Sequence, residues 1–257
     1  NATFTTEDKT PPTVTITPAD NSSDVSLKTN ITYVFDEPIR NTDNTPLTDT
    51  NVDELIRVHD TNKNGTNIAF DATVNANKTQ ITVVPAADFN SLQYIYTEIG
   101  ATVEDTSDNI ISPTTSTFTA EDAIAPIPSF DPSNTETNVA VNKSIRITFD
   151  KNIRKLDDGA LDDDNVDALI HLRNNDASGA DIPFDATIDK NYPIITIDPI
   201  DNFKSEQIVY VKVAKVEDNT NNASRDTSIT FTAAAVTTIT FSPANNALSV
   251  PSNSSIT

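Results

Sequence analysis

Hydrophobic and polar residues alternate along the chain in short runs, the pattern of β-strands that bury one face. Clusters of Pro, Asn, Asp and Ser separate the runs, and these residue types form turns. In the first half of the chain the runs lie at Thr13–Thr17, Ile31–Phe35, Leu55–His59, Ile68–Val74, Thr79–Val84, Leu92–Val103 and Thr115–Thr119. The pattern predicts a seven-stranded antiparallel β-sandwich.

The same pattern returns 114 positions later, as Phe35 and Phe149 illustrate. After an opening strand around Pro128–Phe130, the second set of runs lies at Ile145–Phe149, Leu169–Arg173, Ile182–Ile188, Ile194–Ile197, Ile208–Val216 and Ser228–Thr232. Only the segments after Asn51 and Asn165 suggest a helical turn, with each Asn as the expected N-cap. The chain is therefore predicted to be all-β, with two tandem seven-stranded antiparallel sandwiches.

The repeat also sets the expected domain boundaries, with full domains at residues 11–123 and 124–235. Residues 1–10 carry the last-strand pattern of a preceding repeat, and residues 236–257 the first strands of a following one. Strands left alone at the ends would present unpaired backbone edges. We expect a longer polypeptide to complete them, because most of the third repeat is missing; strand addition between separate subunits is the alternative.

Composition narrows the classes of function. There is no Cys, so disulfides and thiolate metal sites are excluded. The chain has 38 acidic residues against 17 basic ones, and the net charge of −21 repels nucleic acid and anionic lipid while attracting cations. No apolar run is long enough to cross a membrane. Neither nucleic acid nor direct membrane insertion is expected for this segment.

A set of short motifs recurs in both repeats. Each has a strand ending in Phe-Asp with an Ile three residues after the Asp, a late Val-Glu-Asp-x-x-x-Asn and a closing Thr-Phe-Thr, and Pro18-Ala-Asp-Asn precedes the first set. With these motifs the chain resembles the bacterial Ig-like domains of S-layer proteins and large surface adhesins. The resemblance covers both full repeats and the head of the third. It implies Ig-like sandwiches used as spacer or lattice modules outside the cell, and it implies no catalytic residue.

No enzyme motif emerges from the sequence. His59 and His171 are the only histidines and do not occupy matching positions, so they are expected to be ordinary strand side chains. There is no nucleophile elbow, phosphate-binding glycine loop or zinc-ligand pair, and no Trp to wall a glycosidase cleft. We predict that the chain is not an enzyme. N-glycans are permitted at eight sequons, at Asn1, Asn21, Asn30, Asn64, Asn77, Asn142, Asn222 and Asn253.

Acidic loops are the strongest local signal. Strand alternation brings the linker acids to the entrance of repeat two, and a matching group precedes repeat one, where Glu37, Asp43, Asp49 and Glu104 lie nearby. Ca²⁺ takes 6–8 oxygen ligands and suits such clusters. The alternative is a set of solvated loops without an ion. The expected ligands are Glu121, Asp122, Asp150, Asp157, Asp158, Glu217 and Asp218 at the junction, and Glu7, Asp8, Asp36 and Asp105 before repeat one. The third junction, after Phe231, lacks the Glu-Asp pair and is expected to be tighter and independent of ions.

These observations favour a structural repeat segment of an extracellular, cell-surface protein, as an S-layer, adhesin stalk or filament, with joints stiffened by calcium. Its expected partners are neighbouring copies of the same repeat or subunit. One alternative is an adhesin module that recognises glycan or protein, which should show an exposed aromatic platform. The other is a spacer module in a secreted hydrolase.

Overall fold

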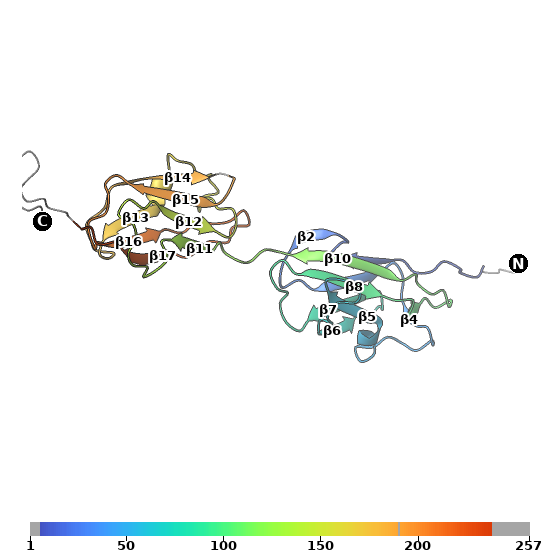
Figure 1. Ribbon diagram of the computed structural model, residues 1–257. Coiled ribbons are helices and arrows are strands. Elements are labelled where there is room, and N and C mark those ends of the chain that lie inside the picture. The colour runs from blue at the N-terminus through green and yellow to red at the C-terminus, as the bar shows by residue number, and fades with distance from the viewer. Residues whose placement is uncertain (1–5, 190, 238–257) are drawn as a thin grey trace, which may run out of the picture. The chain divides into compact units, whose positions relative to one another are not determined.

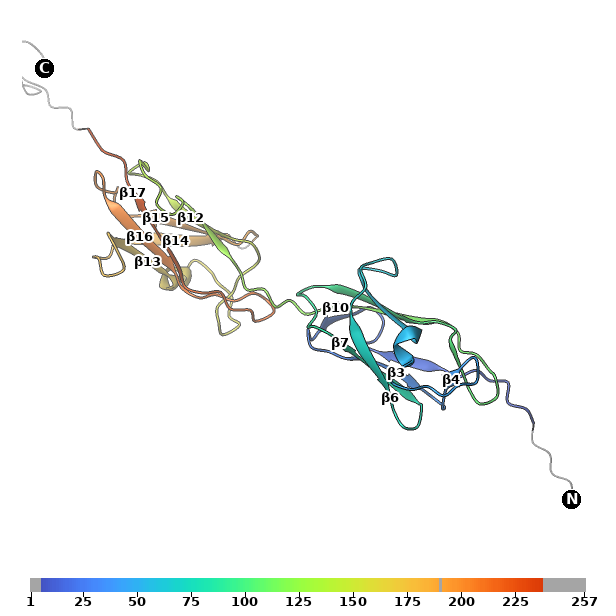
Figure 2. The same cartoon turned by 90° about the horizontal axis from the view of Figure 1, so that it is seen from below.

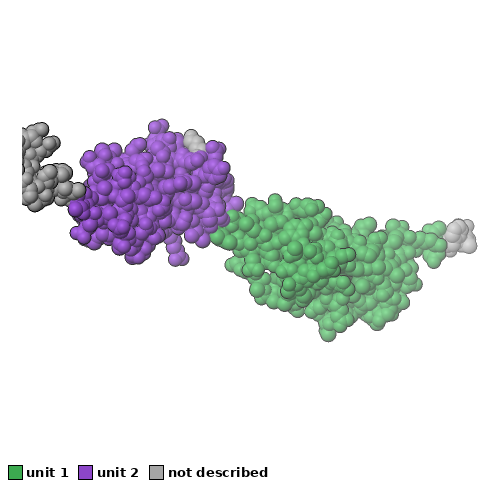
Figure 3. All heavy atoms as spheres, in the orientation of Figure 1, with its two compact units in different colours: residues 1–124 green, residues 125–257 purple. Residues whose placement is uncertain are grey.

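The computed structural model describes residues 6–189 and 191–237. The chain divides into two compact units, Asn1–Ile124 and Ala125–Thr257 (Figure 3). We refer to them as repeat one and repeat two and describe each by itself. Of the predicted terminal strands, residues 1–5 and 238–257 lie outside the described residues, and the described part of the third junction ends at Thr237. Within the described ranges no helix has the length and apolar character needed to span a membrane.

Repeat one is built from two four-stranded sheets and one short ladder (Figure 1). The first sheet has the order β1 (Val14–Thr17), β3 (Ile31–Phe35), β7 (Gln80–Pro85), β6 (Phe70–Val74). The second has the order β2 (Ser22–Val25), β10 (Thr114–Ala120), β8 (Tyr94–Ile99), β5 (Ile56–Asp60). The ladder joins β4 (Arg40–Asn41) to β9 (Val103–Glu104).

Repeat two follows the same plan. One sheet has the order β11 (Pro128–Asp131), β12 (Ile145–Phe149), β15 (Ile194–Pro199), β14 (Phe184–Asp189), and the other β13 (Ile170–Asn174), β16 (Ile208–Val213), β17 (Thr227–Thr232). The predicted all-β, tandem Ig-like fold is confirmed.

Three details of the strand prediction are wrong, and the first is that β4 lies in none of the predicted runs. The run Leu92–Val103 forms two strands, β8 and β9, because the chain bends after Ile99 and β9 pairs with β4 instead of β5. The sequence also gave no sign of β2. Its residues, Ser-Ser-Asp-Val, have no apolar alternation, and the strand forms through parallel backbone pairing with β10.

The core of each repeat consists of alternating strand residues. In β3, Ile31, Tyr33 and Phe35 are buried while Thr32 and Val34 face outward, as the period of a strand requires. Phe35 is 4% exposed and its counterpart Phe149 2%. Each core also contains an edge-to-face phenylalanine pair, Phe89 with Phe118 and Phe203 with Phe231, at centroid distances of 5.6 and 5.5 Å. The apolar positions therefore match across the 114-residue offset.

The two helical turns are short 3₁₀ segments, η1 (Val52–Leu55) and η2 (Val166–Leu169); η1 is the coiled ribbon in Figure 2. Asn51 precedes η1 but its side chain does not cap it, contrary to the prediction. Its Oδ1 accepts instead from the amide of Thr48 at 2.8 Å, because the preceding loop folds back on it. Within the turns, Asp53 and Asp167 accept from the amides of Ala72 and Ala186, both at 2.8 Å, and so tie each helix to its sheet.

The left-handed positions of the turns are filled without glycine. Thirteen described non-glycine residues have positive φ, and none of the described glycines does. Most of the thirteen are Asn or Asp, which tolerate the left-handed region. The others include Thr61 at φ 63° and Leu92 at φ 57°. The turns thus hold left-handed conformations with residues other than glycine.

One buried polar contact distinguishes the two cores. The Tyr33 hydroxyl of β3 is hydrogen-bonded to the Thr97 hydroxyl of β8, which joins the two sheets of repeat one across the core. Both residues are 0% exposed. The corresponding positions of repeat two carry Ile147 and Val211, also 0% exposed. One fold therefore accepts either a paired polar contact or an apolar one at this site.

We predict that Tyr33→Phe destabilises repeat one by about 1–3 kcal/mol, because the Thr97 hydroxyl is left buried without its partner. Adding Thr97→Val should recover most of this loss, since both polar groups are then removed together. Calorimetric unfolding of the single and double variants measures the difference. Tyr94→Phe, at a residue that is 41% exposed, is the control. A double variant no more stable than Tyr33→Phe would contradict the prediction.

Candidate metal centre at the entrance of repeat one

Three carboxylates from distant parts of the chain meet where the chain enters repeat one. Asp8 precedes β1, Glu37 follows β3, and Asp105 follows β9. The antiparallel pairing of β1 with β3 places Val14 opposite Phe35, so the segment before β1 lies beside the residues after β3. A carboxylate oxygen from each of Asp8, Glu37 and Asp105 lies within 4.8 Å of the others. We call these residues the acidic triad.

Backbone and amide donors hold two members of the triad in place. Asp105 is 1% exposed and its Oδ1 accepts from the amides of Ser107 at 2.7 Å and Asn109 at 2.9 Å. Asn109 Nδ2 also donates to Asp105 Oδ2 at 2.8 Å and to the carbonyl of Asp8 at 3.2 Å. Asp8 Oδ1 accepts from the amide of Thr10 at 3.0 Å. The site is therefore organised by the chain itself before any ion is added.

The pKa values of Glu37 and Asp105 are shifted in opposite directions. Desolvation, followed by the negative charges of Asp105, Asp8 and Asp36, raises the pKa of Glu37. Burial opposes ionisation of Asp105 as well, but hydrogen bonds from Asn109 and Ser107, with the attraction of Arg40, hold the pKa of Asp105 below its ordinary value. A cation at this point would relieve the repulsion. Carboxylate oxygens are the ligands that Ca²⁺ prefers, and waters can complete its shell.

Repeat two carries a cation of its own at the matching position. Lys151 stands 114 residues after Glu37, and its Nζ lies 3.3 Å from Oδ2 of Asp218, the counterpart of Asp105. Asp218 is held by the same kind of turn, since its Oδ1 accepts from the amides of Thr220 and Asn222 at 2.9 and 3.0 Å. An ammonium group thus lies beside the buried aspartate of repeat two, where repeat one has a third carboxylate.

Several other predicted ligands accept hydrogen bonds from backbone amides. Asp36 accepts from Thr13 and Asp150 from Ile127, both at 2.8 Å, so this contact is the same in both repeats. Glu121 Oε1 accepts from the amide of Leu27 at 3.0 Å. Asp122 Oδ1 accepts from the Ser91 hydroxyl and the amide of Ile124, at 3.1 and 3.0 Å.

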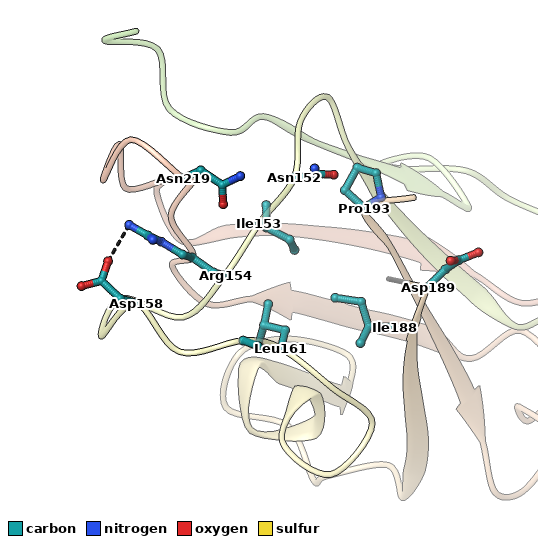
Figure 4. A pocket seen from close by; sticks show the side chains of 10 residues that line it. Asn152, Ile153, Arg154, Asp158, Leu161, Ile188, Asp189, Pro193 and Asn219 are labelled. Carbon is teal, nitrogen blue, oxygen red and sulfur yellow. Dashed lines mark ion pairs between the residues drawn. The ribbon is translucent and has the colours of Figure 1, made fainter. Parts of the chain in front are cut away.

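The remaining predicted ligands lie beside cationic side chains. Glu217 is 6% exposed and accepts from Arg154 Nε at 3.1 Å, and Arg154 also pairs with Asp158 at 2.5 Å (Figure 4). Arg154 and Asp158 line an open pocket of about 380 Å³ with an aliphatic floor that includes Leu161 and Ile188. Asp157 lies 3.9 Å from Lys155, and Glu7 lies 3.2 Å from Lys9.

Among the described residues, Asp8 and Asp105 are the only predicted ligands that the structure brings together in a cluster of three carboxylates. The third member of that cluster is Glu37, which was not among the predicted ligands. The predicted cluster at the junction combines linker acids of one unit with loop acids of the other. It stays a prediction. Many of the other acids follow a signal that is readable in the sequence. Asp two residues before Thr, Ser, Gly or Asn commonly closes a turn with its own side chain, as Asp157 does with Gly159 at 3.1 Å.

The two histidines lie on strands, as expected. His59 is in β5, and its Nδ1 lies 2.9 Å from the carbonyl of Lys63. His171 is in β13. They lie far apart in the chain, one in each repeat, and neither belongs to the acidic triad.

Comparison with known proteins places both repeats in one family profile. The bacterial Ig-like domain matches residues 8–120 and 122–233. No curated protein matches the chain. Among solved structures, the chain is similar to an I-band fragment of titin at 6% identity, with a TM-score of 0.38, over 88% of this chain and 65% of that one.

It is also similar to the N-terminal part of the bacterial S-layer protein SbsC at 13% identity, with a TM-score of 0.30, over 86% of this chain and 44% of that one. The chain spans less than two thirds of either fragment. Both TM-scores lie below 0.5, so neither likeness says what this chain does.

The Asp218 turn predicts a pH dependence for repeat two. Although burial opposes its ionisation, hydrogen bonds from Asn222 and Thr220 hold the pKa of Asp218 well below its ordinary value. An unfolded Asp titrates at about pH 3.9. The contribution of Asp218 to stability is therefore complete above about pH 4 and is lost as the pH falls toward the folded pKa.

Asp218→Asn should lower the stability of repeat two at pH 7 and flatten its loss of stability below pH 4. Urea unfolding at several pH values measures this, with Asp201→Asn as the control; parallel profiles for wild type and Asp218→Asn would contradict it.

Proposed function

The chain belongs to the bacterial Ig-like domain family, and we propose that it is a structural repeat segment of an extracellular surface protein that carries tension between neighbouring copies of the repeat. Domains of this kind are typical of non-enzymatic structural modules. An S-layer, an adhesin stalk and a filament share this mechanical role. Labelling of intact cells by an antibody raised against the chain is the expected sign of its surface location.

The observation that carries this proposal is the pairing of the first and last parts of each sandwich. In repeat one, β2 pairs in parallel with the final strand β10. In repeat two, the segment around Val139 pairs in parallel with the end of β17, through Val139 to Thr232 at 3.1 Å and Ala234 to Val139 at 2.7 Å. Tension applied at the two ends of a repeat pulls these parallel segments past each other. Their hydrogen bonds are then strained together instead of one after another.

A side chain reinforces this pairing in each repeat. Asp20 Oδ1 accepts from both the amide and the hydroxyl of Thr117, at 2.9 and 2.8 Å. In repeat two, Asn134 Oδ1 accepts from the amide of Thr230 at 3.1 Å. Charge-assisted hydrogen bonds are stronger than neutral ones, so the contact in repeat one is the firmer of the two.

Calcium has a specific place in this proposal. Asp8 lies on the segment that leads into repeat one, whereas Glu37 and Asp105 lie on the sandwich. An ion held by all three would fix the incoming segment to the domain and stiffen that joint. The ammonium of Lys151 beside Asp218 supports the idea, because it puts a positive charge at the corresponding place in repeat two.

We predict that Asp20→Ala lowers the force at which repeat one unfolds when the chain is stretched in a single-molecule experiment. Each unfolding repeat should release roughly 350 Å of extended chain. Repeat two serves as an internal reference, and Asp71→Ala on β6, away from the parallel pair, is the matched control. Equal unfolding forces for Asp20→Ala and Asp71→Ala would argue against tension acting through β2 and β10.

We predict that the chain binds Ca²⁺ through the acidic triad, with Kd about 10⁻⁴–10⁻³ M, the range of extracellular calcium modules. At a free concentration about 100 times Kd, binding should stabilise repeat one by about 2.7 kcal/mol. Glu37→Gln should remove the calorimetric signal, and Asp43→Asn should not.

Glu37→Lys tests the comparison with repeat two directly. It should abolish Ca²⁺ binding and yet leave repeat one more stable than Glu37→Gln does in the absence of calcium, because the lysine supplies the charge that Lys151 supplies in repeat two. Unchanged binding heat in Glu37→Gln would refute the site while leaving the mechanical role untouched.

A further inference from the structure

The outer face of β13 and β16 in repeat two gathers four polar side chains. His171 lies directly opposite Lys212, and Arg173 directly opposite Tyr210, in neighbouring cross-strand pairs. All four alternate with buried residues, such as Leu172 and Val211, and so share the side of the sheet that faces away from the core. Together with Ala177 of the following loop they line an open pocket of about 200 Å³.

Repeat one presents a related set on its matching face. Arg57 lies opposite Glu98, and His59 opposite Tyr96. Arginine and histidine have exchanged places between the repeats, and the tyrosine is common to both. His59 stacks on Tyr96 with a centroid distance of 6.4 Å and an interplanar angle of 30°.

The decisive difference lies two residues after the tyrosine. In repeat one the Tyr96 hydroxyl donates to Oε2 of Glu98 at 2.6 Å, so the face supplies its own carboxylate. In repeat two the residue at this place is Lys212. Tyr210 thus has a cationic neighbour where Tyr96 has an anionic one. Repeat one thus shows that this face accommodates a carboxylate beside the tyrosine hydroxyl. Repeat two has the tyrosine and cationic donors, but Lys212 replaces the glutamate that would accept from the tyrosine.

The existing contacts of the cations leave donors available. Arg173 Nε pairs with Asp181 at 2.9 Å and its Nη1 donates to the carbonyl of Ala177. Lys212 Nζ pairs with Asp226 at 2.8 Å. Asp181 and Asp226 are 81% and 47% exposed, and ion pairs at such exposure contribute little. An ammonium has three donors and a guanidinium five, so each can hold a further acceptor.

We propose that this face of repeat two, centred on Tyr210 and Lys212, binds the carboxylate of an acidic sugar. Tyr210 and Lys212 hold the carboxylate, with Arg173 and His171 beside it. The hydroxyls of Ser228 and Thr230 on β17, in register with Lys212 and Tyr210, lie next to the pocket for the hydroxyls of the sugar. This function lies beyond the mechanical role and does not depend on calcium.

Size and charge favour a sugar over an acidic peptide. The pocket is smaller than the about 300–1,000 Å³ of sites for drug-sized ligands, so it admits no more than about one ring. The tyrosine and imidazole rings offer flat walls for such a ring. A peptide rich in Asp and Glu would bring several negative charges toward a chain of net charge −21, whereas one uronate ring brings a single charge.

Chemical-shift titration of the ¹⁵N-labelled chain with D-glucuronate tests the proposal, with D-glucose and acetate as matched probes. Glucuronate should shift amides of β13, β16 and β17 in a saturable way and bind more tightly than acetate, and glucose should cause no shift there. Acetate binding as tightly as glucuronate would overturn the assignment to a sugar. The absence of saturable shifts on these strands would overturn the site.

Exchanging the residue two positions after the tyrosine between the repeats gives the sharpest control. Lys212→Glu recreates the self-satisfied face of repeat one and should weaken glucuronate binding by about tenfold or more, the loss of one charge-assisted hydrogen bond. Glu98→Lys should create a second site, with new saturable shifts on β5 and β8. The same spectra report whether each variant is folded. Undiminished binding by folded Lys212→Glu would sink the proposal.

Discussion

The need of every loop amide for an acceptor governs this structure more than any other constraint. Backbone N–H groups that leave a sheet must find a partner in the protein or in water, and this chain supplies carboxylates at many of those points. Asp36 and Asp150 do so in front of the first strand of each repeat, and Asp53 and Asp167 at the helical turns. The net charge of −21 is thus in part a by-product of how the loops are closed.

The two repeats serve as natural variants of one another, because a single backbone holds different side chains at equivalent points. Tyr33 is replaced by Ile147 in the core, Glu37 by Lys151 at the entrance, and Glu98 by Lys212 on the outer face. The last two replacements exchange an anion for a cation without changing the fold. Since Ig-like sandwiches hold their shape through the buried face, the loops and outer faces are free to differ in chemistry.

Much of the fold follows from the sequence because alternation marks every strand that buries one face. The strands that carry no such alternation, β2 and β4, escape prediction, since they form by pairing with β10 and β9 and bury little. The candidate site was predicted in part. The cluster before repeat one could be located from strand direction, but its membership could not. Glu37 lies beside other acids, whereas Glu121 accepts a hydrogen bond from a backbone amide. Which of the two occurs depends on side-chain positions that differ by only a few ångströms, and the sequence pattern does not specify them.

The scarcity of glycine in the turns has a further consequence. Left-handed turn positions filled by Asn, Asp, Thr or Leu restrict the unfolded chain more than glycine would. Peptide cleavage requires a segment to open and extend into the protease, and flexible loop tips are the usual point of attack. The loops of this chain are restricted in the unfolded state and held by side-chain hydrogen bonds in the folded state, so they seldom open far enough to be cleaved. A protein built this way is suited to long survival where it is neither refolded nor replaced.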